Sequence, residues 1–419
     1  MGYQWLKGEV VSWQAPSGIP VRFIPLPGFN KAFASVTFGF GSNDLKFRLD
    51  GREFELPPGT AHFLEHKLFE EEEGNALLRF ASLGANANAY TDHTITSYLF
   101  VTADRFHDCL KVLLEFVQHP YITPESVEKE KGIIEQELRM YNDMPEVILA
   151  RQMLECMFWR HPVRIDIGGT VESIKEIDHQ TLLMCHGAFY HPSNGMLLVV
   201  GDLEVEEVKR HVAEGWAVGE GLAVTRVRVD EPRTVFKRSA EAYMSVGVPM
   251  VAVGFKDLRL PGTPEALTVQ EICTKLALEA MLGKSSPLYQ ELYDSGLIDD
   301  TFDAGYEGEA DYGFTYLSGR SRDPEKLARR LVDELTNLRS DLLAETRVER
   351  AKKRMLGQAV FLLNSPEALA QTYNSLYFKG IDLFDYVDKI RSVRVEDVVD
   401  RAKQHFTEEN YVVSVVWPR

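Results

Sequence analysis

The segment HFLEH carries two histidines and a glutamate at a spacing that suits metal chemistry. It lies in PPGTAHFLEHKLFE, a pattern that predicts a turn followed by a helix with Thr60 as its cap. Residues four apart share one face of a helix, so His62 and His66 would direct their imidazole nitrogens to one point. A tetrahedral zinc ion requires this of its first two ligands, and Glu65 would reach a water molecule beside it.

The specificity of this motif is moderate. With 11 histidines in 419 residues, HxxEH arises by chance in roughly a few per cent of chains of this composition. A lone histidine is more often structural. The motif inverts the better-known HExxH, and both patterns occur in zinc peptidases. HFLEH therefore favours a catalytic metal site in which Glu65 is the general base.

A catalytic zinc ion takes three protein ligands and keeps one position open, so a third ligand is needed from another element. The segment EKEKGIIEQEL offers four carboxylates on a predicted helix: Glu128, Glu130, Glu135 and Glu137. Glu130 and Glu137 are two turns apart on the stripe that includes Ile134, so both would point toward the core. Buried carboxylates are costly unless they are paired or bound to metal. The competing interpretation is a solvated run of charges.

The second half of the chain repeats the first at an offset near 221 residues, which indicates duplication. ESVEKEKGIIEQELRMYNDMPEVILA aligns with TRVERAKKRMLGQAVFLLNSPEALA, and further segments follow in the same order. The positions that match Glu130 and Glu137 hold Ala351 and Gln358. Because the carboxylates occur only in the half that has the histidines, the charge-run interpretation is weakened.

The alternating strand and helix patterns of each half predict an α+β fold built from two homologous half-repeats. We expect an N-terminal zinc-binding domain over residues 1–225 and a homologous C-terminal domain without the zinc site over residues 240–419. The boundary is expected in the charged stretch 224–240. Thr123 and Pro124 predict the start of a helix that reaches Met140.

Composition excludes several other classes of protein. A net charge of -17, from 63 acidic and 46 basic residues, argues against nucleic acid as a partner. Those carboxylates either solvate the surface, which is the favoured interpretation, or attract basic peptides. We find no apolar run long enough to span a membrane and no leader pattern at MGYQWLKGEVV, so we expect a cytoplasmic protein. The widely spaced cysteines predict buried free thiols: Cys109, Cys156, Cys185 and Cys273.

HFLEH together with the later EKGIIEQE resembles the pitrilysin (insulinase) family of inverzincin metallopeptidases, which includes insulin-degrading enzyme and mitochondrial processing peptidase. LGANANAYT, GGTVESI and FYHPSN extend the likeness over essentially the whole chain, above all to small bacterial members of the YmfH type. The resemblance implies that each repeat is a mostly antiparallel sheet packed with helices. It also implies one Zn2+ per chain, held by His62, His66 and Glu137. Glu65 would be the general base, and Glu130 would orient a ligand histidine.

The same resemblance implies hydrolysis of peptides or leader sequences that add as an extra strand to a sheet edge. Asn88, Ala89, Tyr90 and Thr91 occupy the positions of that edge strand. Backbone pairing would bind an extended peptide, and side-chain pockets would supply selectivity. Without the resemblance, an interior strand or hairpin near Gly84 would have equal weight.

Many family members complete the site with an Arg and a Tyr seven residues later. The matching segment here, LYQELYDSGLIDD, has Tyr293 and Asp300 at those positions, or Asp299 at the second one if Gly296 is aligned. The departure implies a heterodimer with a homologous subunit that lacks zinc and supplies the Arg and Tyr. The alternative is a catalytically inactive, zinc-stabilised scaffold or peptide-binding subunit, but the intact Glu65 argues against it.

Overall fold

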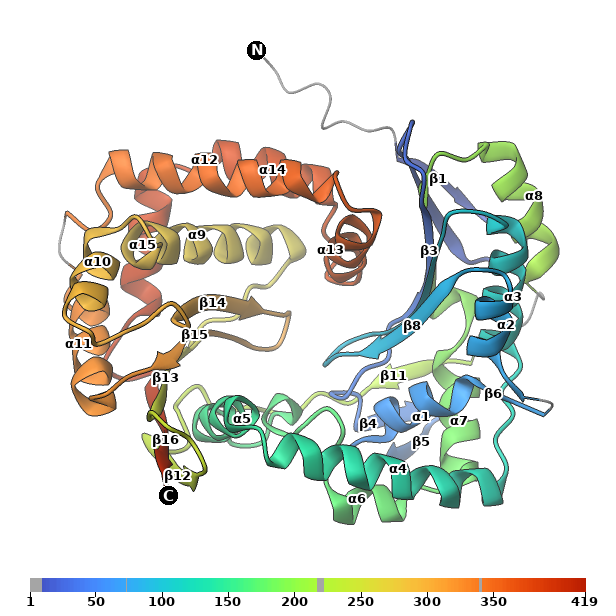
Figure 1. Cartoon of the computed structure of the whole chain (residues 1–419), viewed down its shortest axis with the longest axis horizontal. Helices are drawn as coiled ribbons and strands as arrows, with labels where there is room; N and C mark the ends of the chain where they lie inside the picture. The colour runs from blue at the N-terminus through green and yellow to red at the C-terminus, as the bar shows by residue number, and fades with distance from the viewer. Residues whose placement is uncertain (1–9, 73, 217–221, 339–340) are drawn as a thin grey trace. The chain divides into compact units, whose positions relative to one another are not determined.

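The computed structural model describes residues 10–72, 74–216, 222–338 and 341–419 (Figure 1). Contacts divide the chain into two compact units. Unit 1 comprises Met1–Leu138, Asp166–Arg228 and Leu362–Phe378. Unit 2 comprises Arg139–Ile165, Val229–Phe361 and Lys379–Arg419.

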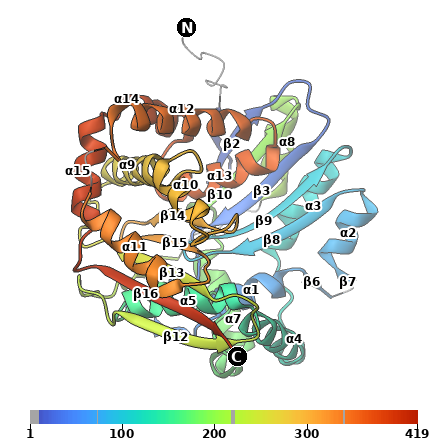
Figure 2. The same ribbon diagram turned by 60° about the vertical axis from the view of Figure 1, so that its left-hand side comes forward.

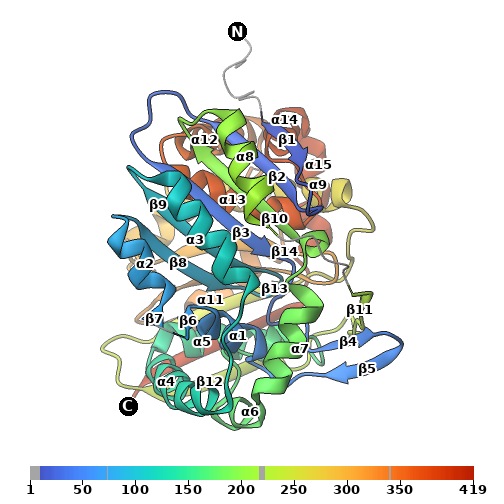
Figure 3. The same ribbon diagram turned by 90° about the vertical axis from the view of Figure 1, so that its right-hand side faces the viewer.

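Unit 1 contains a six-stranded sheet in the order β1-β2-β10-β3-β9-β8. Its strands are β1 (Val11–Gln14), β2 (Pro20–Pro25), β3 (Ala32–Phe38), β8 (Asn86–Thr91), β9 (Thr96–Thr102) and β10 (Gly195–Gly201). Neighbouring strands are antiparallel except β2 and β10. Strands β3 and β10 are buried along their whole length, because α3 (Phe106–Gln118) and α13 (Pro366–Phe378) cover opposite faces of the sheet (Figures 1 and 3).

The helices α1 and α4 of unit 1 carry the candidate metal ligands. The further elements of this unit are α1 (Thr60–Leu68), α2 (Ala76–Ser82), α4 (Pro124–Asn142), α6 (Val171–Glu176), α7 (His179–Phe189), α8 (Val205–Gly215), β4 (Lys46–Leu49), β5 (Arg52–Glu55), β6 (Glu70–Glu71), β7 (Gly74–Asn75) and β11 (Val224–Arg226). Helix α4 begins as predicted, with the Thr123 hydroxyl accepting from the Ser126 N–H at 3.1 Å.

The predicted cap of α1 is wrong. The residue before the helix is Gly59, in the left-handed region at φ +93°, and no side chain caps the helix. The Thr60 hydroxyl instead donates to the Pro57 carbonyl at 2.7 Å. Thr60 is therefore the first residue of the helix, and its hydroxyl closes the preceding turn.

Unit 2 contains a five-stranded sheet in the order β12-β16-β13-β15-β14 (Figure 2). The unit consists of α5 (Pro145–Met157), β12 (Ser239–Met244), β13 (Met250–Lys256), α9 (Pro264–Leu282), α10 (Pro287–Asp294), β14 (Asp303–Gly308), β15 (Gly313–Arg320), α11 (Pro324–Thr336), α12 (Glu345–Leu362), α14 (Leu383–Ser392), α15 (Val395–His405) and β16 (Tyr411–Pro418). The pairing repeats that of unit 1, since only β12 and β16 are parallel. The predicted class of two α+β repeats with mostly antiparallel sheets is confirmed.

The two repeats exchange one helix each. Helices α5 and α13 begin at Pro145 and Pro366, which keep the offset predicted from the sequence. Helix α5 packs on β12, β13 and β16, whereas α13 packs on β3 and β10. The two compact units therefore do not coincide with the continuous segments 1–225 and 240–419. Those segments describe how the sequence is duplicated, whereas each compact unit includes one helix from the other segment.

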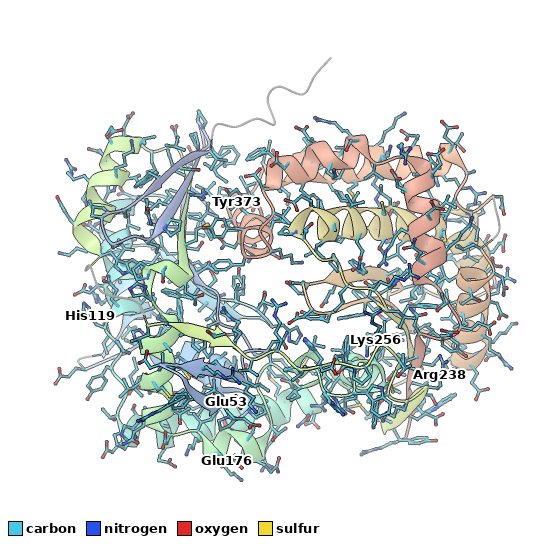
Figure 4. The ribbon with its side chains drawn as sticks, turned by 180° about the vertical axis from the view of Figure 1, so that it is seen from behind. Glu53, His119, Glu176, Arg238, Lys256 and Tyr373 are labelled. Atoms are coloured by element: carbon cyan, nitrogen blue, oxygen red, sulfur yellow. The ribbon has the colours of Figure 1, made fainter. Side chains whose placement is uncertain are left out.

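The interior of unit 2 contains paired charges at the end of β13. Lys256, which is labelled in Figure 4, donates to Glu231 at 2.6 Å. The adjacent Asp257 accepts hydrogen bonds from Arg401 at 2.7 Å and from His405 at 2.8 Å. Pairing of this kind is what makes a buried carboxylate tolerable in a protein core.

The four cysteines are buried and free, as predicted. Among the helices of the described residues, none combines the length and the apolarity needed to cross a membrane.

Candidate metal centre

Three side chains of unit 1 converge where α1 meets α4. His62 and His66 lie one turn apart on α1, with ring centroids 4.6 Å apart, and Glu137 projects from α4. One nitrogen or oxygen atom of each residue lies within 4.8 Å of the others. Glu137 Oε2 is 3.5 Å from His66 Nε2 and 3.9 Å from His62 Nε2. Ligands of a tetrahedral zinc ion lie roughly 3.3 to 3.5 Å apart, given metal bonds of about 2.0 to 2.2 Å.

A buried oxygen atom without a hydrogen-bond partner indicates that these residues suit a bound cation. Glu137 Oε2 is buried and has no hydrogen-bond partner among the residues that the structure describes. A buried carboxylate oxygen without a donor is costly, and a bound cation removes that cost. The nitrogen of His62 that faces Glu137 Oε2 is Nε2, at 3.9 Å. His62 Nδ1 is buried and has no hydrogen-bond partner within the described part of the chain.

Glu130 holds the second histidine in place. Its Oε1 lies 3.0 Å from His66 Nδ1, so Nδ1–H donates to it and Nε2 is left free to face Glu137. Burial works to lower the pKa of His66, but the hydrogen bond to Glu130 and the charges of Glu65 and Glu137 outweigh it and raise that pKa. His66 therefore binds a proton more readily when no metal competes for Nε2.

The two histidines differ in their electrostatics. Burial, reinforced by the neighbouring His66, lowers the pKa of His62 to about 4, although Glu137 and Asp166 act in the opposite direction. At neutral pH the imidazole of His62 is thus uncharged, which is the form that binds a metal.

Glu65 lies on α1 between the two histidines in sequence, but it is not a member of the three-residue group. Its Oε2 accepts a hydrogen bond from Thr91 Oγ1 at 2.9 Å. Burial raises the pKa of Glu65, and the Thr91 hydrogen bond offsets part of that increase. The carboxyl group therefore ionises less readily than an exposed glutamate and is held against the end of β8.

Strand β8 lies at the edge of the unit 1 sheet and pairs with β9. Its side chains alternate between the two faces. Thr91 and Ala89 share the face toward α1, whereas the Tyr90 hydroxyl interacts with Ser97 and with Asn374 of α13. Asn88, on the face of Tyr90, is exposed. The four residues predicted to bind substrate thus share an edge but not a face.

Glycines beside α1 are site residues that sequence reasoning missed. A Cβ atom at Gly59 would lie 2.4 Å from the Gly168 carbonyl oxygen, and one at Gly169 would lie 2.3 Å from the Pro58 carbonyl oxygen. The loop around Gly168 can approach the start of α1 only because both residues lack a side chain. The doublet Gly168–Gly169 was the available signal, since paired glycines often mark a close backbone approach.

The residues expected to depart from the family pattern lie in unit 2. Tyr293 is on α10, its side chain is exposed, and its ring stacks on Tyr289 with centroids 6.1 Å apart. Asp299 Oδ1 accepts from the Thr301 N–H at 2.9 Å. Position 293 is thus a tyrosine and not an arginine, and Asp300 lies in a turn after α10.

The duplicated fold and the His–His–Glu group with its neighbouring carboxyl define a protein of the zinc-peptidase type. Residues 52–171 match the family description "Insulinase (Peptidase family M16)", and residues 176–355 match "Peptidase M16 inactive domain". The chain belongs to the M16 (insulinase) peptidase family, as the sequence motifs predicted.

Relatives support this assignment over the full length. The chain is 36% identical to the uncharacterized zinc protease YmfH of Bacillus subtilis, with 100% of this chain and 98% of that one covered. An M16-like peptidase from Alicyclobacillus acidocaldarius, known as a crystal structure, is 34% identical, with 98% of each chain covered and a TM-score of 0.94. A protease from Helicobacter pylori, at 20% identity and a TM-score of 0.82 over 98% of this chain and 100% of that one, shows the fold alone.

Proposed function

We propose that this chain is the zinc-bearing subunit of a metalloendopeptidase that hydrolyses peptides or leader sequences. One observation carries the proposal. His62, His66 and Glu137 bring three ligand atoms together at a spacing that suits a metal ion, while Glu65 stays outside that group and accepts a hydrogen bond from Thr91. A metal that served stability alone would not need a separate carboxyl group beside it.

The residues have distinct tasks in this proposal. Zn2+ held by His62, His66 and Glu137 would polarise a peptide carbonyl and acidify a water molecule. Glu65 would take the proton of the attacking water and deliver it to the leaving amine nitrogen. A carboxyl group whose pKa is raised by burial suits this exchange, because it must release the proton as well as accept it. The edge of β8 would align an extended peptide through backbone hydrogen bonds.

A partner subunit is part of the proposal. Tyr293 and Asp300 stand where the family pattern has an arginine and a tyrosine. An aspartate would oppose the negative charge that develops on the carbonyl oxygen during attack, whereas an arginine or a tyrosine would stabilise it. A homologous subunit without HxxEH would supply the missing pair.

The Glu65→Gln variant tests the catalytic role. We expect it to keep one zinc ion per chain and to lose roughly 100-fold or more of the turnover of a quenched fluorescent peptide, measured with the homologous partner present. Glu128→Gln is a matched control, because that carboxylate is exposed on α4 with 70% of its side chain accessible. If Glu65→Gln keeps wild-type turnover, the catalytic proposal is wrong. If the wild-type pair binds zinc but cleaves no peptide, the scaffold alternative is favoured.

The partner is tested separately by assaying the purified chain alone and after addition of the homologous subunit. Turnover is expected only in the mixture. Full activity of the chain alone would reject the requirement for a second subunit.

A further inference from the structure

The hydroxyl of Thr91 contacts the proposed base directly. Thr91 is the last residue of β8, and its Oγ1 lies 2.9 Å from Glu65 Oε2. Both side chains are partly shielded from solvent. A hydrogen bond to a carboxylate is stronger than one between neutral groups, and partial burial strengthens it further.

The surroundings of Thr91 fix the direction of this hydrogen bond. Thr96, directly opposite Thr91 on β9, has its Oγ1 3.3 Å from Thr91 Oγ1. The Thr96 hydroxyl donates to the Phe40 carbonyl at 2.8 Å, so its only hydrogen is engaged there. Thr96 therefore cannot donate to Thr91. An ionised carboxylate cannot donate either, so the Thr91 hydroxyl is the donor to Glu65, which at 2.9 Å is also closer than Thr96. Because threonine is branched at Cβ, its side chain has few rotamers on a paired strand.

We infer that Thr91 is a positioning residue that fixes the rotation of the Glu65 carboxyl group, an inference that rests on the proposed function. Its hydroxyl occupies Oε2, so Oε1 is the oxygen left to meet the attacking water. Since Thr91 belongs to the edge strand expected to pair with the peptide, the backbone that aligns the substrate also holds the base. Thr91 was predicted only as part of the substrate-binding strand, and its side chain adds this second role.

The competing explanation is that Thr91 merely satisfies a partly buried carboxyl group. In that case its loss would lower stability, and a change in activity would follow protein unfolding. A positioning role predicts a different pattern, in which folding, zinc content and KM are retained while kcat falls, because only the step that uses the oriented carboxylate is affected.

Three variants separate these explanations. Thr91→Val removes the hydroxyl but keeps the shape, Thr91→Ser keeps the hydroxyl, and Thr94→Val removes a hydroxyl from the neighbouring turn that contacts Asp92 rather than Glu65. With a quenched fluorescent peptide and the homologous partner, we expect kcat of Thr91→Val to fall roughly 10- to 100-fold at unchanged KM and zinc affinity. Thr91→Ser should recover most of kcat, and Thr94→Val should match the wild type. Wild-type kcat in Thr91→Val, or no recovery in Thr91→Ser, would overturn the inference.

Crystal structures of the zinc-loaded wild type and Thr91→Val decide the same point without any assay. The Glu65 carboxyl group is expected to lie against Thr91 in the wild type and to rotate in the variant. An unchanged carboxyl position in Thr91→Val would overturn the inference even if activity fell. A wild type that cleaves no peptide would reject the proposed function, yet this comparison would still decide whether Thr91 positions Glu65.

Discussion

His66 Nδ1 and Glu130 Oε1 lie 3.0 Å apart and join α1 to α4 by a hydrogen bond. Glu137 projects from the same helix as Glu130, two turns further on. One helix thus supplies both a candidate metal ligand and the carboxylate that is hydrogen-bonded to a second candidate ligand, His66. A substitution at Glu130 should therefore alter the zinc affinity before it alters other properties of the protein.

Replacing Glu130 by alanine is expected to weaken zinc affinity about 10- to 100-fold, because His66 loses the partner that fixes its ring and its tautomer. Glu130→Gln should lie between the alanine variant and the wild type, since the amide oxygen can still accept the hydrogen bond. Competition with a chromophoric chelator measures the affinity. Glu128→Ala on the same helix is the control, and equal affinities for Glu130→Ala and Glu128→Ala would contradict the assignment.

Zinc affinity is expected to fall in acid because the metal must displace a proton from His66. Burial alone would lower the pKa of His66, but Glu130 and the nearby carboxylates raise it above its ordinary value. Below that pKa the protonated form prevails, and affinity should drop about tenfold per pH unit for the one proton displaced. The pKa of His62 is about 4, so a proton competes with the metal for His62 only near that pH. Affinity that stays constant from about pH 7 to pH 5 would contradict this interpretation.

Gly59→Ala is expected to destabilise unit 1 by about 1 to 3 kcal/mol. The φ angle of Gly59 is +93°, and the added Cβ would meet the Gly168 carbonyl oxygen at 2.4 Å. Gly187→Ala is the opposite control, because its Cβ would meet nothing within 4 Å and it lies within α7. Alanine there should stabilise by about 0.5 to 1 kcal/mol. Urea denaturation measures both, and equal effects of the two variants would refute the packing argument.

Asp257→Ala is expected to destabilise unit 2 by about 3 to 5 kcal/mol, because Arg401 and His405 would lose their buried partner. Burial works to raise the pKa of Asp257, but His405 and Arg401 outweigh it and hold that pKa well below its usual range. A depressed pKa in the folded state gives stability that is present above the pKa of the unfolded chain, near 4, and is lost as the pH falls below it.

Thermal melts from neutral pH into acid measure this loss. Asp257→Ala should flatten the decline relative to the wild type. Asp400 is exposed, so Asp400→Ala should leave the decline in melting temperature unchanged. An equal decline in the wild type and in both variants would exclude Asp257 as its cause.

The sequence by itself determined the features that depend on local spacing. The helix period places His62 and His66 on one face wherever α1 lies in the fold, because four residues make about one turn. The repeat offset predicted matching helices, and α5 and α13 keep that offset. The start of α4 followed from Thr123 and Pro124, which act within a single turn.

Only the tertiary structure decided the features that depend on packing between distant segments. Helical spacing selected Glu130 and Glu137 from the four carboxylates of α4, but only the contact of α4 with α1 places Glu137 at the histidine nitrogens and Glu130 behind His66. The helix exchange could not be predicted, because the faces of α5 and α13 fit either sheet by pattern alone. The hydrogen bond between Thr91 and Glu65 joins the end of a strand to a helix, and neither segment encodes the other's position.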